Sequence, residues 1–168
     1  LDKTIPFMGD YVTAVSDSLK AYLVKIGVRA DKIQVLPAGV NASMFSARNK
    51  LALREKYGYR EEQQIVIYTG SLDKFQRIDY LLDATHLLKP KYPELKVILA
   101  SNIANQKDLD TIEAQIQALD IDDVVDIVKG LELEKLPDYL ALSDVATLPR
   151  TDCPGHPVKI LNYMCGNI

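Results

Sequence analysis

Short apolar blocks and longer amphipathic blocks alternate along the chain from residue 64 onward. The apolar blocks are rich in β-branched residues, which is typical of buried strands, whereas the amphipathic blocks have the spacing and length of helices. The predicted strands are 64–69, 95–100, 124–128 and 144–148, and the predicted helices are 78–89, 107–119, 133–142 and one that begins at Val158. Strands joined by helices imply right-handed crossovers. The pattern therefore predicts an α/β fold, a Rossmann-like doubly wound parallel sheet.

The chain before residue 48 has a less regular pattern. Its predicted elements are a strand at 11–16, a helix that is capped by Ser16 and stopped by Gly27, and a strand at 33–36. An irregular stretch at 38–46 then precedes a charged helix at 48–57. We interpret residues 1–47 as the tail of one domain with a linker, and residues 48–168 as a second, Rossmann-like domain.

Composition narrows the class of protein. The 168 residues include 20 Lys and Arg against 23 Asp and Glu, a formal net charge of −3, and 48% are hydrophobic, which indicates a globular domain and argues against a nucleic-acid binder. The apolar runs are far shorter than a membrane span. The cysteines and histidines lack the spacing of metal ligands, so we expect no metal, and two cysteines favour reduced thiols in a cytoplasm. These residues are Cys153, Cys165, His86 and His156.

Parallel sheets bind ligands outside the carboxyl ends of their strands, so the loops at those ends are the places to look for chemistry. The loop after Thr69 contains a glycine, a hydroxyl and two cations, which together could hold a diphosphate. These residues are Gly70, Ser71, Lys74 and Arg77. A solvated loop with a glycine turn is the alternative.

The loop at 149–157 is rich in proline and leads into the helix that begins at Val158. Pro157 suits a first helical position and leaves the amides of Val158 and Lys159 available to an anion at the helix N-terminus. Lys159 and Asn162 share one face of the helix, and we expect Ile160, Leu161 and Met164 to face the core. Arg150 could bind phosphate in a fork, and His156 could donate a hydrogen bond to a ligand or lie at the surface. A proline-capped helix with Lys159 in water is the alternative.

In these motifs and their order, the chain resembles the group 1 glycosyltransferases of GT-B architecture, which are retaining enzymes that use nucleotide-sugar donors. The similarity covers nearly the whole chain. It is carried by the segments 15–20, 33–41, 68–72, 78–84, 142–145 and 155–164, together with Gly130.

The resemblance implies roles for individual residues. Lys159 and Arg150 would act in catalysis by stabilising the leaving diphosphate, with Gly70, Ser71, Lys74, Arg77, His156 and Val158 as further diphosphate contacts. The nucleoside and sugar would meet Val128, Leu131, Leu136, Gly155 and Asn162. The chain departs from the family pattern at three places. Ser71 replaces the usual basic residue, and Gln76 and Arg77 replace the usual Lys-Gly pair. Pro154 and Asn162 replace the two usual glutamates.

The resemblance also implies the partners. We expect a nucleotide-sugar donor as substrate, no cofactor, and a glycan or lipid-linked acceptor bound through a domain that this chain lacks, because the chain looks like a fragment incomplete at its C-terminus. A cytoplasmic location follows, with peripheral membrane association only for a full-length protein. Two alternatives stay open: another GT-B enzyme, such as a sugar-nucleotide epimerase or a glycogen synthase-like protein, and a non-catalytic Rossmann-like interaction module.

Overall fold

The computed structural model describes residues 4–102, 105–151 and 157–168. The chain divides into two compact units. The first contains the residues up to Val40 and residues near the start of the last helix, and the second contains residues 41–151 and 162–168. The first break thus lies between Val40 and Asn41, whereas the pattern placed its boundary after residue 47. Phe45 packs against the core of the second unit, which explains why the linker belongs to that unit.

The first unit contains one short parallel pair of strands. Its elements are helix α1 (Ile5–Met8), strand β1 (Val12–Ala14), helix α2 (Asp17–Lys25) and strand β2 (Ile33–Val35). The Ser16 hydroxyl accepts a hydrogen bond from the amide of Leu19 and so caps α2 as predicted. Ala14, Leu23, Val28 and Ile33 form its buried core. Helix α1 was not predicted.

The second unit is built on a four-stranded sheet with the order β5-β4-β3-β6. All of its paired strands are parallel, which confirms the predicted fold class. The elements are α3 (Lys50–Tyr57), β3 (Gln64–Thr69), α4 (Ile78–Leu88), β4 (Leu95–Ser101), α5 (Gln106–Ala118), β5 (Val125–Lys129), α6 (Leu136–Leu142), β6 (Val145–Ala146) and α7 (Val158–Cys165).

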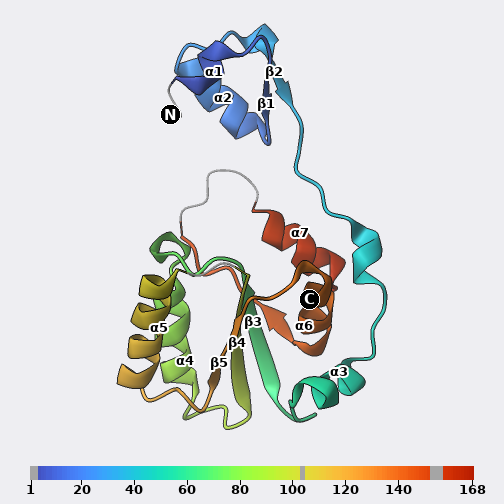
Figure 1. Ribbon diagram of the computed structural model, residues 1–168, viewed down its shortest axis with the longest axis vertical. Coiled ribbons are helices and arrows are strands. Elements are labelled where there is room, and N and C mark those ends of the chain that lie inside the picture. The colour runs from blue at the N-terminus through green and yellow to red at the C-terminus, as the bar shows by residue number, and fades with distance from the viewer. Residues whose placement is uncertain (1–3, 103–104, 152–156) are drawn as a thin grey trace. The chain divides into compact units, whose positions relative to one another are not determined.

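Helices cover both faces of this sheet (Figure 1). Along β4, Val97 and Leu99 belong to the core cluster that includes α4 and α5, while Ile98 and Ala100 belong to the cluster that includes α6. Alternate side chains of one strand therefore enter two cores, which explains why the strand sequences are almost continuously apolar.

The structure corrects two predicted elements. The helix predicted at 133–142 begins as a 3-10 turn at Leu133–Lys135, and only Leu136–Leu142 is α-helical, with Pro137 in its first turn. The strand predicted at 144–148 is confined to Val145–Ala146. Its early end lies at the candidate site.

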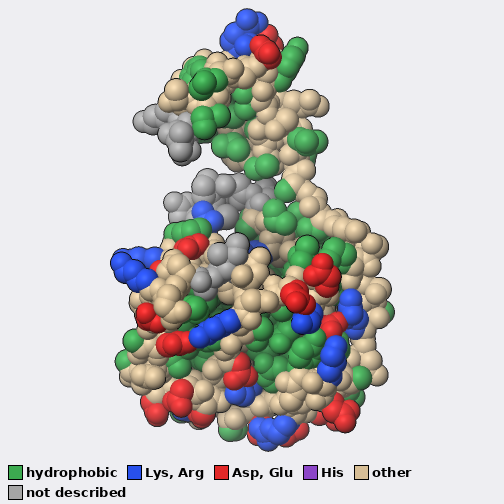
Figure 2. All heavy atoms as spheres, in the orientation of Figure 1, with side chains coloured by type: hydrophobic (Ala, Val, Ile, Leu, Met, Phe, Trp, Pro, Cys, Tyr) green, Lys and Arg blue, Asp and Glu red, His purple; other side chains and the backbone are tan. Residues whose placement is uncertain are grey.

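Charged side chains of both signs are interspersed on the face of the second unit drawn in Figure 2. Positive and negative side chains are therefore mixed over this face and do not form separate patches of one sign. Among the described helices, none has the length and apolar character that a bilayer span requires.

Candidate functional site

The sheet topology marks one place at its carboxyl edge where a ligand is expected. From β3 the chain moves outward to β4 and then β5, and it returns to place β6 on the other side of β3. The loops that follow β3 and β6 therefore leave from neighbouring strands at the point where the strand order reverses, and open α/β sheets bind their ligands at such a point. These are the two loops that the sequence analysis selected.

The beginning of the loop after β3 is fixed by backbone and tyrosine contacts. Gly70 has a φ of 133° and donates its amide hydrogen to the carbonyl oxygen of Ala100 on β4. The Tyr68 hydroxyl donates to the carbonyl oxygen of Ser71 at 2.6 Å, and the Gln76 amide donates to the Ser71 hydroxyl at 3.4 Å. The beginning of the predicted phosphate loop is thus held by hydrogen bonds, while its Lys74 and Phe75 are exposed.

Arg77 is engaged with its own neighbours. It has a φ of 57°, which places it in the left-handed region at the start of α4. Its guanidinium donates to both carboxylate oxygens of Asp79, at 3.0 and 2.8 Å, and lies 3.4 Å from the centroid of the Tyr80 ring. The hydrogen bond from Arg77 lowers the pKa of Asp79. Lys74, in contrast, is exposed on the 3-10 turn of the same loop.

Arg150 links the two loops. It follows β6 and is half-buried, and its guanidinium lies 5.1 Å from the centroid of the Phe75 ring in the loop after β3. A cation at this distance from an aromatic ring is attracted to it. Two segments that lie far apart in the sequence therefore meet across the reversal point.

The C-terminal helix α7 contributes a residue that sequence reasoning missed. Tyr163 is buried, and its hydroxyl contacts the ends of β3 and β6. Of the three residues expected to face the core, Leu161 is half-buried, whereas Ile160 is 38% exposed and Met164 is 70% exposed. The predicted burial of Ile160 and Met164 was wrong, and Tyr163 is the buried residue of this helix.

The other predicted residues of α7 differ in exposure. Val158 is exposed, whereas Lys159 and Asn162 are half-buried. Lys159 stands one helical turn before Tyr163 on the same helix. The predicted contacts at Gly155 and His156, and the family difference at Pro154, lie outside the described residues.

The residues predicted to meet the nucleoside lie in and beside the second core cluster. Leu131 and Leu136 are buried in it, and Val128 packs against it while partly exposed. All three lie near the carboxyl end of β5 or directly after it, so the structure brings them together. Their predicted contact with a base stays a prediction.

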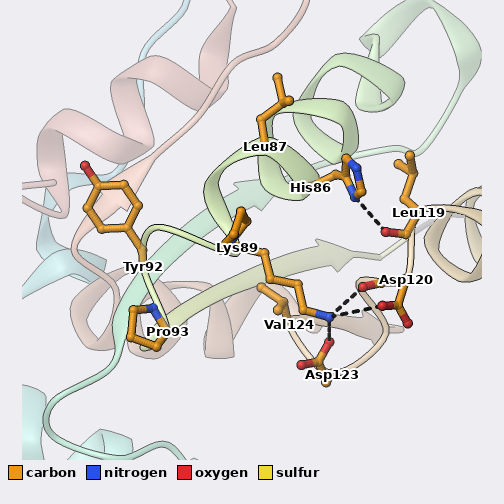
Figure 3. A pocket seen from close by; sticks show the side chains of 10 residues that line it. His86, Leu87, Lys89, Tyr92, Pro93, Leu119, Asp120, Asp123 and Val124 are labelled. Atoms are coloured by element: carbon orange, nitrogen blue, oxygen red, sulfur yellow. Dashed lines mark hydrogen bonds and ion pairs between the residues drawn. The ribbon is translucent and has the colours of Figure 1, made fainter.

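A cavity of about 620 Å³ lies at the opposite, amino edge of the sheet (Figure 3). The Lys89 ammonium there donates to the Asp123 carboxylate at 2.6 Å and also contacts Asp120, while the His86 ring pairs with the carbonyl oxygen of Leu119. Its charges are thus paired within the protein, and it lies away from the two loops at the reversal point.

The described part of the chain offers no cluster of three or more His, Cys, Asp or Glu side chains that could hold a metal ion. The chemistry available near β3 and β6 is instead that of cations and backbone amides. Such groups can bind an anionic ligand and stabilise negative charge that develops on it.

Comparison with known proteins places this arrangement in a family. A model of the family "Glycosyl transferases group 1" matches residues 49–167. The chain is 32% identical over 99 residues to the glycosyltransferase-like protein EpsD of Bacillus subtilis, which covers 57% of this chain and 26% of the relative. It is 26% identical over 167 residues to D-inositol 3-phosphate glycosyltransferase 2 of Catenulispora acidiphila, which covers 94% of this chain and 38% of the relative.

The fold is also found in solved structures. Anabaena Alr3699/HepE in complex with UDP-glucose is similar with a TM-score of 0.83 at 17% identity, over 99% of this chain and 47% of that one. This likeness confirms the predicted GT-B type of fold. The chain spans about a third of the length of the curated relatives it matches.

Proposed function

This chain belongs to the group 1 glycosyltransferases, and we propose that its second unit binds the nucleotide-sugar donor of a glycosyl transfer reaction. The donor would lie at the carboxyl edge of the sheet, outside the ends of β3 and β6. The observation that carries this proposal is the contact between Arg150 and Phe75, which joins the two loops at the reversal point. The solved neighbour in complex with UDP-glucose supports a uridine nucleotide as the first ligand to test.

The contribution of these residues to the reaction is electrostatic. Breaking the bond between the sugar and the diphosphate leaves negative charge on the diphosphate, and preorganised cations stabilise that charge. Arg150 and Lys74 supply cations from the loops after β6 and β3. Lys159 and the amide of Val158 would add a cation and a helix N-terminus. The proposed mechanism uses no metal and no cofactor, and the donor is a substrate.

The remaining parts of the proposal concern the whole protein. We propose a glycan or lipid-linked acceptor that is bound mainly outside this chain, and a cytoplasmic location. The relatives named D-inositol 3-phosphate glycosyltransferases support a hydroxyl-rich acceptor.

Ligand-observed NMR of the chain with UDP, GDP and ADP tests the donor site. We expect saturation transfer to one nucleotide, and loss of that transfer in Arg150→Ala. The matched control is Arg60→Ala, because Arg60 is an exposed arginine that pairs with Glu62 and Glu94 away from the site. Equal transfer in wild type and Arg150→Ala would remove Arg150 from the site.

A second candidate function, a non-catalytic interaction module, is favoured by one observation. Arg77, a cation predicted to meet the diphosphate, is held by Asp79 and stacked on Tyr80 instead. An interaction module would show no saturation transfer to any nucleoside diphosphate, while a donor site would show it for at least one. The NMR experiment therefore separates the two functions.

A further inference from the structure

At the early end of strand β6, one hydroxyl group stands between β6 and β3. Ile67 on β3 pairs with Ala146 on β6, and the amide of Thr147 donates to the carbonyl oxygen of Ile67 at 2.8 Å. In a parallel ladder the next hydrogen bond would run from the amide of Thr69 to the carbonyl oxygen of Thr147. These two groups instead both contact the Tyr163 hydroxyl.

The hydroxyl satisfies both sides of the interrupted ladder. It accepts from the amide of Thr69 at 3.1 Å and donates to the carbonyl oxygen of Thr147 at 3.3 Å. It also pairs with the Thr69 side-chain hydroxyl at 3.2 Å. One donated and two accepted hydrogen bonds are the full capacity of a phenol, so the group is fully used. Burial raises the pKa of Tyr163, which keeps the proton needed for the donated bond at neutral pH.

The Tyr163 hydroxyl lies between β3 and β6, the strands at which the strand order of the sheet reverses. The loops with Lys74 and Arg150 begin within a few residues of Thr69 and Thr147, and Lys159 stands one turn before Tyr163 on α7. A hydroxyl inserted between two strands keeps them further apart than a direct hydrogen bond would. It therefore sets where both loops begin.

We propose that Tyr163 is a positioning residue whose hydroxyl, inserted between β3 and β6, holds apart the two loops between which the donor diphosphate binds. This inference rests on the proposed function, because it concerns the same site. Tyr163 makes no contact with the donor in this scheme and acts through the strand ends. Without the hydroxyl, Thr69 and Thr147 can bond directly, and the two loops move toward each other.

Nucleotide affinity of two matched variants tests the proposal. Tyr163→Phe removes the inserted hydroxyl and keeps the ring. Tyr57→Phe is the control, because its hydroxyl donates at 3.0 Å to Asp138 between α3 and α6, away from the two loops. Calorimetric titration with UDP, or with whichever of GDP and ADP binds, should show affinity at least about fivefold weaker for Tyr163→Phe, because the two loops would begin in positions that no longer suit the diphosphate. Tyr57→Phe should change it less than about twofold.

The thermal midpoints of both variants distinguish positioning from general stability. We expect both to fall by similar amounts, with only Tyr163→Phe losing affinity. Amide hydrogen exchange of the unmodified protein adds a test that needs no variant, since the Thr69 amide should be protected like the strand interior. Exchange of that amide at the rate of an exposed loop would overturn the inference, whether or not Tyr163→Phe folds.

The outcomes also separate this inference from the proposed function. Wild-type protein that binds no nucleoside diphosphate would overturn the donor site, and the positioning role with it. Wild-type protein that binds a nucleotide, with Tyr163→Phe binding it equally well, would overturn the positioning role alone.

Discussion

Strand β3 is fixed at its two ends by groups of different charge. At the amino end the Asp144 carboxylate accepts from the amide of Ile65 at 2.7 Å, and Lys50 and Arg54 pair with the same carboxylate. At the carboxyl end the neutral Tyr163 hydroxyl accepts from the amide of Thr69. At both ends a backbone amide needs an acceptor, yet only at the amino end is that acceptor negatively charged.

The difference matches the ligand expected at each edge. A carboxylate in place of the Tyr163 hydroxyl would repel a diphosphate and would compete for the cations around it. At the amino edge the Asp144 carboxylate has no such effect, because it pairs with Lys50 and Arg54 of the protein itself. The amino edge is therefore an internally neutralised structural region, whereas the carboxyl edge fixes its backbone with a neutral group.

The largest expected effect comes from breaking the amino-edge network. Arg54 is 4% exposed and donates to the carbonyl oxygens of Leu142 and Glu61 as well as to Asp144. Arg54→Met should lower the free energy of unfolding by about 2–4 kcal/mol, because it removes a buried guanidinium and leaves the carbonyl oxygens of Leu142 and Glu61 without their donor. Urea denaturation measures this change.

The control for that variant is Arg60→Met, which removes an arginine whose side chain is 58% exposed and should cost less than about 1 kcal/mol. Equal costs for the two arginines would contradict the structural role of the amino edge.

A smaller effect, on binding rather than on folding, is expected at the carboxyl edge. Lys159→Ala should weaken nucleoside-diphosphate binding at least about tenfold, or about 1.4 kcal/mol, through loss of one cation. Lys107→Ala, an exposed lysine on α5, should leave binding unchanged. The titration used for Tyr163 measures both, and unaltered affinity in Lys159→Ala would place that lysine outside the site.

The sequence predicted the strands and loops at the two edges of the sheet better than the side-chain contacts between them. Strand β3 was predicted at its observed bounds because a continuous apolar run between polar residues has few other structures available to it. The two loops were selected because the ends of the strands and the composition of the loops are both visible in sequence.

The parts that could not be predicted depend on tertiary contacts. Tyr163 lies among apolar residues on α7, so its pattern is that of a core position, and the hydroxyl acquires its role only when β3 and β6 meet. The same contact lies where β6 ends. Arg54 lies in a charged helix, and its burial depends on carbonyl groups that come from α6 and from the turn after α3. Periodicity carries no signal for either contact.

Acid should first weaken the contacts that helix α3 makes with Asp138 and Asp144. Although burial acts to raise them, the pKa values of Asp138 and Asp144 are lowered overall, for Asp138 by hydrogen bonds from Lys56 and Tyr57 and for Asp144 by one from Lys50. Since these pKa values are below that of an unfolded aspartate, about 3.9, the stabilisation is present above that pH and is lost as the pH falls through the folded values.

Unfolding free energies measured from pH 6 down to pH 3 should therefore decrease more steeply in wild type than in Asp138→Asn. Asp110→Asn, on the exposed face of α5, should keep the wild-type slope. A wild-type slope in Asp138→Asn would show that the Asp138 network contributes nothing to acid sensitivity.

The smallest effect tests the pair of Arg77 and Asp79, where the carboxyl edge behaves like the amino edge. Asp79→Asn removes the charge that holds the guanidinium and should leave Arg77 more available to a diphosphate. Exposed ion pairs contribute less than about 1 kcal/mol, so the gain in nucleoside-diphosphate affinity should be about two- to threefold. Asp83→Asn, on the same helix and contacting Gln115, is the control for a general change of charge. A loss of affinity in Asp79→Asn would mean that the pair shapes the loop for the ligand, because the guanidinium would then be needed where Asp79 holds it.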